Sequence, residues 1–362
     1  MQPMQISSSL GSSSREKSRW RRLLRGFCAS TQNGNSRSDT TTTTGSCGNP
    51  LVMLVTFALP TLICLVLLWH WIRRDPYTSS PFCDPDGTCH EVPYKPSPRT
   101  VYSSWNKQQY QSWWRFHHHL EQTAKDFQGQ RPLVLLGDSI TEAWLGTGMG
   151  EPRHRAQGVP EVLDDWMETC NLPWNPLVLA ISGDQTQHLL WRLANGELVD
   201  SVAHNKDALF VVLIGTNNLG AGDLPEPTAQ GVLAVVDYLV QRVKGRILLL
   251  ELLPRGDGPT WLPDLCPPRC DKQGHSFTSF LPAIAKVNDD VRQGVQQRRS
   301  GGDKEMSEKL DILDCGDVFV QNVPSGEQVN TALMPDRLHP NAAGHKLLAN
   351  CISKWIRDNI VL

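Results

Sequence analysis

The hydrophobic positions between residues 130 and 315 form short uninterrupted runs, separated by longer amphipathic segments. The runs predict strands at residues 132–136, 177–182, 208–214, 246–252 and 310–314. Because the runs lack the alternation of half-exposed strands, we expect both faces of each strand to be buried. Strands of this kind are typical of a parallel sheet that is covered by helices.

Two segments near these runs place apolar residues at helical spacing. The first comprises Val232, Leu233, Val236, Leu239, Val240 and Val243, and the second Leu347, Leu348, Cys351, Ile352, Trp355 and Ile356. The alternation of strands and helices predicts an α/β fold, with a doubly wound, parallel five-stranded sheet between two helical layers. We expect surface excursions at residues 256–279, rich in Pro, Gly and Cys, and at the polar residues 300–308.

An apolar stretch of a different kind precedes this region. Residues 51–72 contain no Asp, Glu, Lys or Arg, and reach the roughly 20 residues that a helix needs to span a bilayer. The stretch is longer than the apolar part of a cleaved signal peptide, about 7 to 15 residues, and begins far from the N-terminus. We therefore expect one transmembrane helix.

A basic cluster precedes this helix, in which Arg15, Lys17, Arg19, Arg21, Arg22 and Arg25 surround one acidic residue, Glu16. The positive-inside rule therefore places the N-terminus in the cytosol, and the remainder in the Golgi or ER lumen or outside the cell. The expected parts are a disordered basic tail, a transmembrane helix, a Pro-rich stalk and a folded domain, at 1–50, 51–72, 73–100 and 101–362. Alternatively, the Ser-, Thr- and Arg-rich start is a transit sequence, and the helix is an anchor in an organelle inner membrane.

Charge and cysteine content constrain the partners. A net charge of -2 gives no indication of nucleic-acid binding. The pairs Cys83/Cys89 and Cys266/Cys270 form small disulfide loops in an oxidising lumen, or remain thiols in a reducing compartment. The cysteines after the apolar stretch are odd in number, so at least one is unpaired unless a second chain contributes a cysteine. A homodimer is therefore an open alternative. Cys266 and Cys270 with His275 also resemble half of a zinc site, but a second ligand pair is missing.

Small and polar residues follow the first three predicted strands. Ser139 comes after the first strand, Gly183 (in Ile-Ser-Gly-Asp) after the second and Asn217 (in Gly-Thr-Asn-Asn) after the third. Ligands of open parallel sheets bind beyond the carboxyl ends of the strands, so we expect these residues to share one rim. Asp336 and His339 follow much later, in Asp-Arg-Leu-His-Pro.

Together these residue types match the requirements of serine-dependent ester hydrolysis. Ser139 is the expected nucleophile, and His339 the base, since a histidine ordinarily titrates near neutral pH. Asp336 is close enough along the chain to fix the imidazole tautomer. The backbone N–H groups of Ser139 and Gly183 and the amide of Asn217 form the expected oxyanion hole, and no cofactor or metal is needed.

Two other function classes stay open. One is a metal-dependent phosphoesterase, which Gly137-Asp138 and Gly215-Thr216-Asn217 superficially suggest. The chain lacks the Asp-x-His motif expected before such a two-metal site, and the consecutive histidines at 117–119 cannot all face one ion from a helix. The other is an anchored domain that binds a lipid or a protein without turnover, although such a domain would not need all of these polar residues together.

The chain resembles the GDSL, or SGNH, hydrolase family. The resemblance rests on Gly137-Asp138-Ser139, Gly183, Gly215-Thr216-Asn217 and Asp336 with His339, across roughly residues 130–360. Within this family the chain is similar to the catalytic subunits of intracellular platelet-activating factor acetylhydrolase, through residues 183–193, 195–198 and 252–256. The resemblance implies a flavodoxin-like three-layer SGNH domain and metal-free hydrolysis of an ester through an acyl-serine, often with short acyl or acetyl groups carried by lipids or glycans.

The chain also departs from the family pattern. Val178 and Ala180 stand where the family usually has asparagine and glycine, and residues 258–277 look like an insertion. These differences leave the expected catalytic residues intact but put the acyl pocket in doubt. Trp191, Arg192 and Glu197 match the family too, and we expect them to pack a helix rather than to act in catalysis.

Overall fold

The computed structural model describes residues 91–360, except 101–103, 105, 170–172, 257–278, 302–303 and 325. The predicted tail, the transmembrane segment and most of the stalk lie outside the described residues, as do both close cysteine pairs and most of the expected excursion at 256–279. Within the described part of the chain, no helix is long and apolar enough to cross a membrane.

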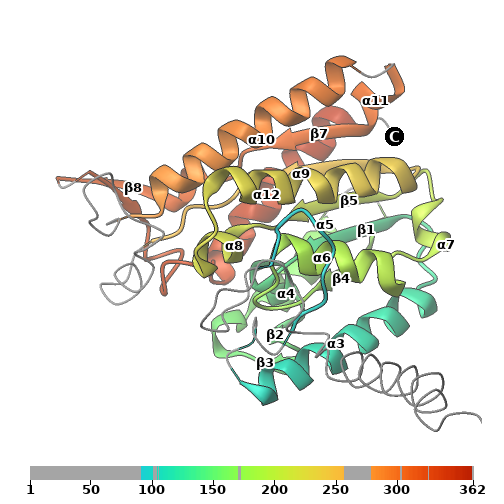
Figure 1. Ribbon diagram of the computed structural model, residues 1–362, viewed down its shortest axis with the longest axis horizontal. Coiled ribbons are helices and arrows are strands. Elements are labelled where there is room, and N and C mark those ends of the chain that lie inside the picture. Colours follow the sequence, from blue (N-terminus) through green and yellow to red (C-terminus); the bar gives the residue numbers. More distant parts are fainter. Residues whose placement is uncertain are drawn as a thin grey trace, which may run out of the picture. The chain divides into compact units, whose positions relative to one another are not determined.

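A parallel sheet of five strands lies at the centre of the fold, as the apolar runs predicted (Figure 1). Its strands have the spatial order β4-β1-β5-β6-β7, which in chain order is second, first, third, fourth and fifth, as in flavodoxin-like sheets. Each strand agrees with its prediction to within two residues at either end, the bounds being β1 Pro132–Gly137, β4 Asn175–Ala180, β5 Leu209–Leu213, β6 Arg246–Leu250 and β7 Leu310–Leu313.

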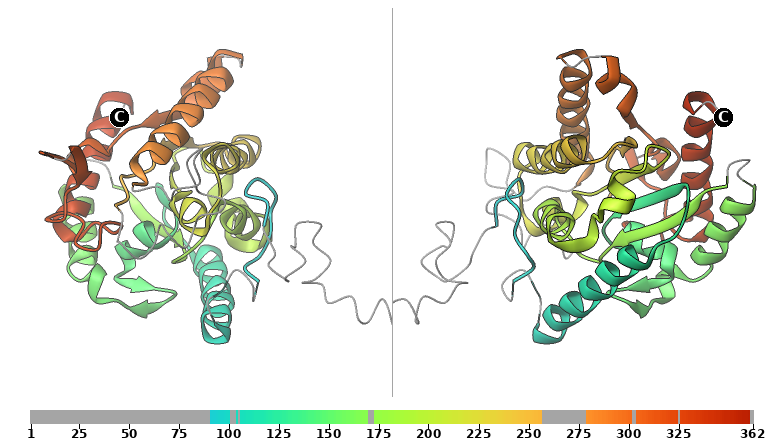
Figure 2. Two further views of the ribbon diagram at one scale, coloured as in Figure 1. Left: turned by 60° about the vertical axis from the view of Figure 1, so that its left-hand side comes forward. Right: turned by 90° about the vertical axis from the view of Figure 1, so that its right-hand side faces the viewer.

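Helices cover both faces of this sheet (Figure 2). Alternate residues of β1 point to opposite faces, so that Val134 and Leu136 belong to one apolar core and Leu133 and Leu135 to the other. The first core packs against α3 Lys107–Asp126, α6 Thr186–Arg192, α9 Pro225–Arg242 and α10 Leu281–Gly301. The second core packs against α5 Val159–Thr169 and α12 Ala342–Asn359. The three-layer prediction is confirmed, and α9 and α12 are the two helices expected from periodicity.

The remaining elements are short. They are the helices α4 Ser139–Glu142, α7 Asp200–Ala203, α8 Thr216–Ala221 and α11 Lys304–Lys309, the turns η2 Ala143–Leu145, η3 His154–Ala156, η4 Leu193–Glu197 and η6 Asp317–Phe319, and the paired strands β2 Thr147–Gly148 with β3 Glu151–Pro152 and β8 Val320–Val323 with β9 Gly326–Val329. The expected excursion at 300–308 is largely helical, because α10 extends to Gly301 and α11 follows. Lys and Glu are good helix formers, so a polar stretch of this composition need not be a loop.

Residues 91–100, which the sequence assigned to the stalk, lie on the folded domain. The Thr186 hydroxyl donates to the Pro93 carbonyl (2.8 Å), and the Ser97 N–H donates to the Gln187 carbonyl (3.2 Å). Both bonds attach this segment to the start of α6. We call residues 91–100 the strap; it passes beside α6 in Figure 1. The packed part of the chain therefore begins before Val101.

A disulfide that the sequence analysis did not pair joins Cys315 to Cys351. Its partners are 36 residues apart, the first following β7 and the second lying in α12. The loop that it closes contains Asp336 and His339. The covalent link therefore ties this part of the chain to the sheet and to the last helix.

Candidate active site

Ser139 lies where β1 ends and the short helix α4 begins. Asp138, the residue before it, caps α4 by accepting the Ile140 N–H through Oδ1 (3.0 Å). Gly137 pairs with Ala180 on one side and with Leu213 on the other, so the first three strands end at the same level. This register brings the segments after β1, β4 and β5 to one rim, as the sequence predicted.

His339 reaches Ser139 from a loop far along the chain. Its Nε2 lies 2.8 Å from the Ser139 Oγ, and its Nδ1 lies 2.6 Å from the Asp336 Oδ2. The Asp336 Oδ1 also accepts the backbone N–H groups of His339 (2.7 Å) and Leu338 (3.0 Å). The structure thus brings together, in one chain of hydrogen bonds, the three residues that the sequence proposed as a triad.

The carboxyl of Asp336 is held in its charged form. Burial raises its pKa, but the hydrogen bond and charge of His339 and the two backbone N–H groups outweigh burial and lower the pKa to about 2. Asp336 therefore remains an anion at neutral pH, and an anion in this position favours the His339 tautomer with hydrogen on Nδ1. That tautomer leaves Nε2 as an acceptor for the Ser139 hydroxyl.

The loop that carries Asp336 and His339 is tied to the nucleophile by a residue that the sequence analysis missed. His345, on the first turn of α12, is fully buried, with Nε2 3.0 Å from the Ile140 carbonyl. Burial lowers the pKa of His345, which favours a neutral ring. Helical spacing offered no signal for this contact, because its partner is a backbone atom of the turn after Ser139.

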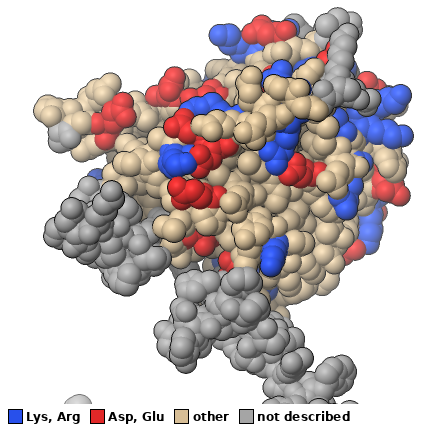
Figure 3. All heavy atoms as spheres, turned by 45° about the horizontal axis from the view of Figure 1, so that its top comes forward, with Lys and Arg blue, Asp and Glu red and all other residues tan. Residues whose placement is uncertain are grey.

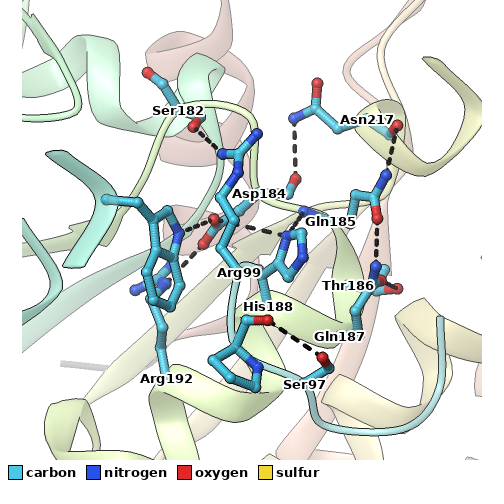
Figure 4. Close-up of polar contacts among 12 residues, drawn as sticks. Ser97, Arg99, Ser182, Asp184, Gln185, Thr186, Gln187, His188, Arg192 and Asn217 are labelled. Atoms are coloured by element: carbon cyan, nitrogen blue, oxygen red, sulfur yellow. Dashed lines mark hydrogen bonds and ion pairs between the residues drawn. The ribbon is translucent and has the colours of Figure 1, made fainter. Parts of the chain in front are cut away.

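Gly183 and Asn217, the other expected oxyanion donors, lie on the turns that follow β4 and β5, on either side of the end of β1. Figure 4 shows Asn217 beside Asp184. The Asn217 side-chain amide donates to the Asp184 carbonyl (2.9 Å), which joins the turn after β5 to the turn after β4. Gly183 has a φ of +81°, a conformation that side chains disfavour. A Cβ on Gly183 would lie 2.8 Å from Nη1 of Arg99, so a larger residue would also displace the end of the Arg99 side chain.

The residue before Gly183 is held by Glu142, which the sequence analysis also missed. Glu142 ends α4 and is fully buried, and its Oε2 accepts both the N–H (2.7 Å) and the hydroxyl (2.6 Å) of Ser182. Its oxygens also accept the backbone N–H groups of Met149 and Gly150, both at 2.9 Å. One carboxylate therefore joins the helix that starts at Ser139 to the turn that contains Gly183.

Beneath this turn lies a fully buried group of charges. Asp184 accepts the Trp113 indole N–H through Oδ1 (2.6 Å) and the Arg192 Nε through Oδ2 (2.7 Å). Arg192 also pairs with Glu197 and donates to the Gly137 carbonyl (3.3 Å). The opposite charges compensate one another, as burial requires. Arg192 thus joins α6 to the sheet, and Glu197 joins Arg192 to His117 on α3, in keeping with the packing role expected of them. The ring of Trp191 packs 5.9 Å from that of Trp113.

Asp138 differs from these paired carboxylates. Its Oδ2 is buried and has no hydrogen-bond partner among the described residues. Burial raises the pKa of Asp138 to about 7; the bond from the Ile140 N–H opposes this shift, while the charge of Asp184 adds to it. A carboxyl group of the Gly-Asp-Ser turn therefore titrates near neutral pH.

Among the described residues, one group could hold a metal ion: His117, His118 and Glu121 on α3. The group does not include His119, in keeping with the expectation that the three consecutive histidines cannot face one ion. The His117 Nδ1 lies 2.8 Å from Glu197, and Glu121 also pairs with Lys125 at 2.7 Å. The site around Ser139 shares none of these ligands.

Charges of both signs are interspersed over the face shown in Figure 3.

The segments that form this rim and carry Ser139, His339 and Asp336 match the pattern of a known family. Residues 135–347 match the model of the GDSL-like lipase/acylhydrolase family, which is more than half of the chain. The chain belongs to this family. Members of a lipase and acylhydrolase family act on ester bonds, so the resemblance drawn from the motifs is confirmed at the family level.

Relatives of this GDSL-like chain include subunits of platelet-activating factor acetylhydrolase IB. The alpha1 subunit of Homo sapiens is 33% identical over 148 residues, covering 41% of this chain and 53% of that subunit. The alpha2 subunit of Gallus gallus is 36% identical over 123 residues, covering 34% of this chain and 49% of that subunit. The matched segment thus spans about half the length of these relatives.

Solved structures are more distant. A GDSL-like lipase from Bacteroides thetaiotaomicron is 16% identical, with a TM-score of 0.47, over 67% of this chain and 97% of that one. An acetyl xylan esterase variant from Geobacillus stearothermophilus is 20% identical, with a TM-score of 0.41, over 64% and 97% of the two chains. Scores below 0.5 indicate a loose similarity.

Proposed function

We propose that this GDSL-like acylhydrolase is a serine esterase that removes short acyl or acetyl groups from a lipid or a glycan. The observation that carries the proposal is the continuous contact from the Ser139 Oγ to the His339 Nε2 (2.8 Å) and from the His339 Nδ1 to the Asp336 Oδ2 (2.6 Å). Family membership and the platelet-activating factor acetylhydrolase relatives support the same reaction class.

In this mechanism the Ser139 oxygen attacks the ester carbonyl as His339 takes the hydroxyl proton at Nε2. Asp336 stabilises the imidazolium that forms. The N–H groups of Ser139 and Gly183 and an N–H of the Asn217 amide stabilise the oxyanion. His339 then protonates the departing alkoxide, and an acyl-serine remains. A water molecule, deprotonated by His339, attacks the acyl group, and collapse of the second tetrahedral intermediate releases the acid and restores Ser139.

The test is hydrolysis of p-nitrophenyl acetate, butyrate and octanoate by the wild type and by Ser139→Ala, with and without a chelator. We expect turnover that requires Ser139, that is unchanged by the chelator and that is faster for the shorter acyl chains. Ser201→Ala is a matched control, since Ser201 is exposed on α7. Full activity of a folded Ser139→Ala variant would refute the proposal, and loss of activity with the chelator would indicate a metal-dependent mechanism instead.

An anchored domain that binds a ligand without turnover is the other function that the residues around Ser139 allow. A fluorophosphonate distinguishes the two, because it reacts only with an activated serine hydroxyl. Labelling of the wild type but not of Ser139→Ala is the result expected of an esterase. Absence of labelling in a folded wild-type protein would favour the binding role.

For the whole chain we propose a single-pass membrane protein with a cytosolic N-terminus and a lumenal or extracellular catalytic domain. The apolar residues 51–72 and the basic residues before them support the anchor and its orientation. The Cys315–Cys351 disulfide supports an oxidising compartment. Protease treatment of sealed microsomes should spare the domain, whereas digestion before the membrane is opened would contradict a lumenal location.

A further inference from the structure

The strap brings a buried arginine to the turn that contains Gly183. The Arg99 Nη1 donates to the Ser182 carbonyl at 3.1 Å, across 83 residues of sequence, and Arg99 is 5% exposed (Figure 4). Its guanidinium also occupies the space that a Cβ of Gly183 would need. Arg99 therefore bonds to the carbonyl of the Ser182–Gly183 peptide and lies on the side of Gly183 where a side chain would project.

The geometry of a peptide bond makes this contact relevant to the oxyanion. In a trans peptide the C=O of one residue and the N–H of the next point in opposite directions. A group that holds the Ser182 carbonyl on one side therefore fixes the direction of the Gly183 N–H on the other. The positive charge also polarises the peptide, which makes that N–H a stronger donor.

The strap holds Arg99 in place through contacts that do not involve its side chain. Pro93 and Ser97 bond to the start of α6, and the Glu91 Oε2 lies 2.6 Å from the His188 Nε2. Because these bonds order the strap before any substrate binds, little conformational entropy is lost in presenting the guanidinium. Asp184 and Glu91 also lie near enough to stabilise its charge.

From these contacts we infer that Arg99 is a positioning residue that aims the Gly183 N–H at the oxyanion. The inference rests on the proposed esterase function. Since the oxyanion forms only after attack, a positioning role predicts a loss in kcat with little change in KM. Direct removal of an oxyanion donor lowers kcat by about 10²–10³-fold. Arg99 acts through such a donor, so we expect a smaller effect, about tenfold.

The test compares Arg99→Met, Arg99→Lys and the wild type in hydrolysis of p-nitrophenyl acetate, with the thermal midpoint of each variant measured alongside. Methionine keeps much of the side-chain volume but removes the charge and the donors, so kcat should fall about tenfold at a nearly constant KM. Lysine keeps the charge but not the planar donor group, so kcat should fall by about threefold. The matched control is Arg115→Met, which removes an exposed arginine paired with Glu151 at 3.0 Å and should leave kcat unchanged.

A folded Arg99→Met variant with the kcat of the wild type would overturn the inference, as would a rise in KM at constant kcat. If Arg99→Met fails to fold, Arg99→Lys decides, and a folded Lys variant with unchanged kcat is then the contradicting result. Ser139→Ala separates this inference from the proposed function. If activity does not depend on Ser139, the esterase mechanism fails; if it depends on Ser139 but not on Arg99, only the role of Arg99 fails.

Discussion

On one side of Ser139, the turn after β4 is buried beneath the strap, whereas the loop that carries Asp336 and His339 faces solvent. Asp184 and Arg192 are fully buried and bonded to several elements. The side chain of Asp336 is 48% exposed, and its bonds go to residues within three positions along the chain. The donor side, meaning the turn after β4, is thus held by buried long-range contacts, whereas on the base side the Asp336 carboxylate itself is held by local ones.

This difference follows from what each side does in the proposed reaction. Oxyanion donors stabilise the transition state only if they are oriented beforehand, and burial in a dense network of hydrogen bonds orients them. A general base must exchange protons with the leaving group and with water, and the side chain of His339 is not fully buried, being 14% exposed. The carboxyls show the same contrast, since the pKa of buried Asp138 is raised to about 7 and that of Asp336 is lowered to about 2.

The largest effect is expected on the base side, from Asp336→Asn. The amide cannot stabilise an imidazolium and favours the wrong tautomer of His339, so kcat should fall by about 10³–10⁴-fold. Steady-state hydrolysis of p-nitrophenyl acetate measures the change. A fall of less than tenfold would mean that this exposed carboxylate does not orient the base.

On the donor side, Asn217→Ala should lower kcat by about 10²–10³-fold, or roughly 3 kcal/mol of transition-state stabilisation. The substitution also removes the bond to the Asp184 carbonyl, so thermal unfolding of the variant should be measured with the kinetics. An unchanged KM with a lowered kcat would identify Asn217 as an oxyanion donor. A structural role would instead be indicated if the variant loses stability and activity to the same extent at low temperature, and if a stabilising ligand restores both.

The smallest effect concerns the pH dependence of stability. Because the folded state raises the pKa of Asp138 from 3.8 to about 7, it binds more protons than the unfolded state between these values. The free energy of unfolding should therefore decrease as pH rises through this window, and between pH 5 and pH 8 the decrease should be about 2.5 kcal/mol. Asp138→Asn should remove the decrease, as measured by urea unfolding from pH 5 to pH 8.

Asp336→Asn is the control for that experiment. The pKa of Asp336 is lowered to about 2, so its contribution to stability is complete above its unfolded value and is lost only in acid, below the window tested. The decrease between pH 5 and pH 8 should therefore persist in Asp336→Asn. Identical pH profiles for the wild type and Asp138→Asn would show that the buried carboxyl does not titrate there.

Much of the base side and of the sheet could be predicted from the sequence, because their determinants are local. The central strands β1 and β5 are apolar runs that are buried on both faces, and Ser139 and Asn217 lie within a few residues of their ends. Asp336 and His339 bond across three residues, so their relation is visible in the sequence. The helices within residues 300–308, by contrast, could not be predicted, because a short polar stretch shows no apolar stripe from which a helix can be recognised.

The supports of the donor side could not be predicted in this way. Arg99 meets Ser182 across 83 residues, and Glu142 meets the same residue across 40. Cys315 and Cys351 are 36 residues apart, without the close spacing that suggested the other pairs. These contacts depend on the register of the strands and on the path of the strap, which a single sequence does not reveal. The nearest signal was the proline content of the strap, and this favoured a stalk instead.

The distance along the chain between Ser139 and His339 has a consequence for biosynthesis. The two residues are separated by 200 positions, and at about 5–20 residues per second a ribosome needs roughly 10–40 s to add them. The strap, β1 and Ser139 are therefore made long before the base exists. A nascent chain cannot hydrolyse an ester by the proposed mechanism until the loop that carries His339 has emerged, and the Cys315–Cys351 bond cannot close until Cys351 has followed. Formation of the triad and closure of the disulfide thus both come late in the synthesis of this domain.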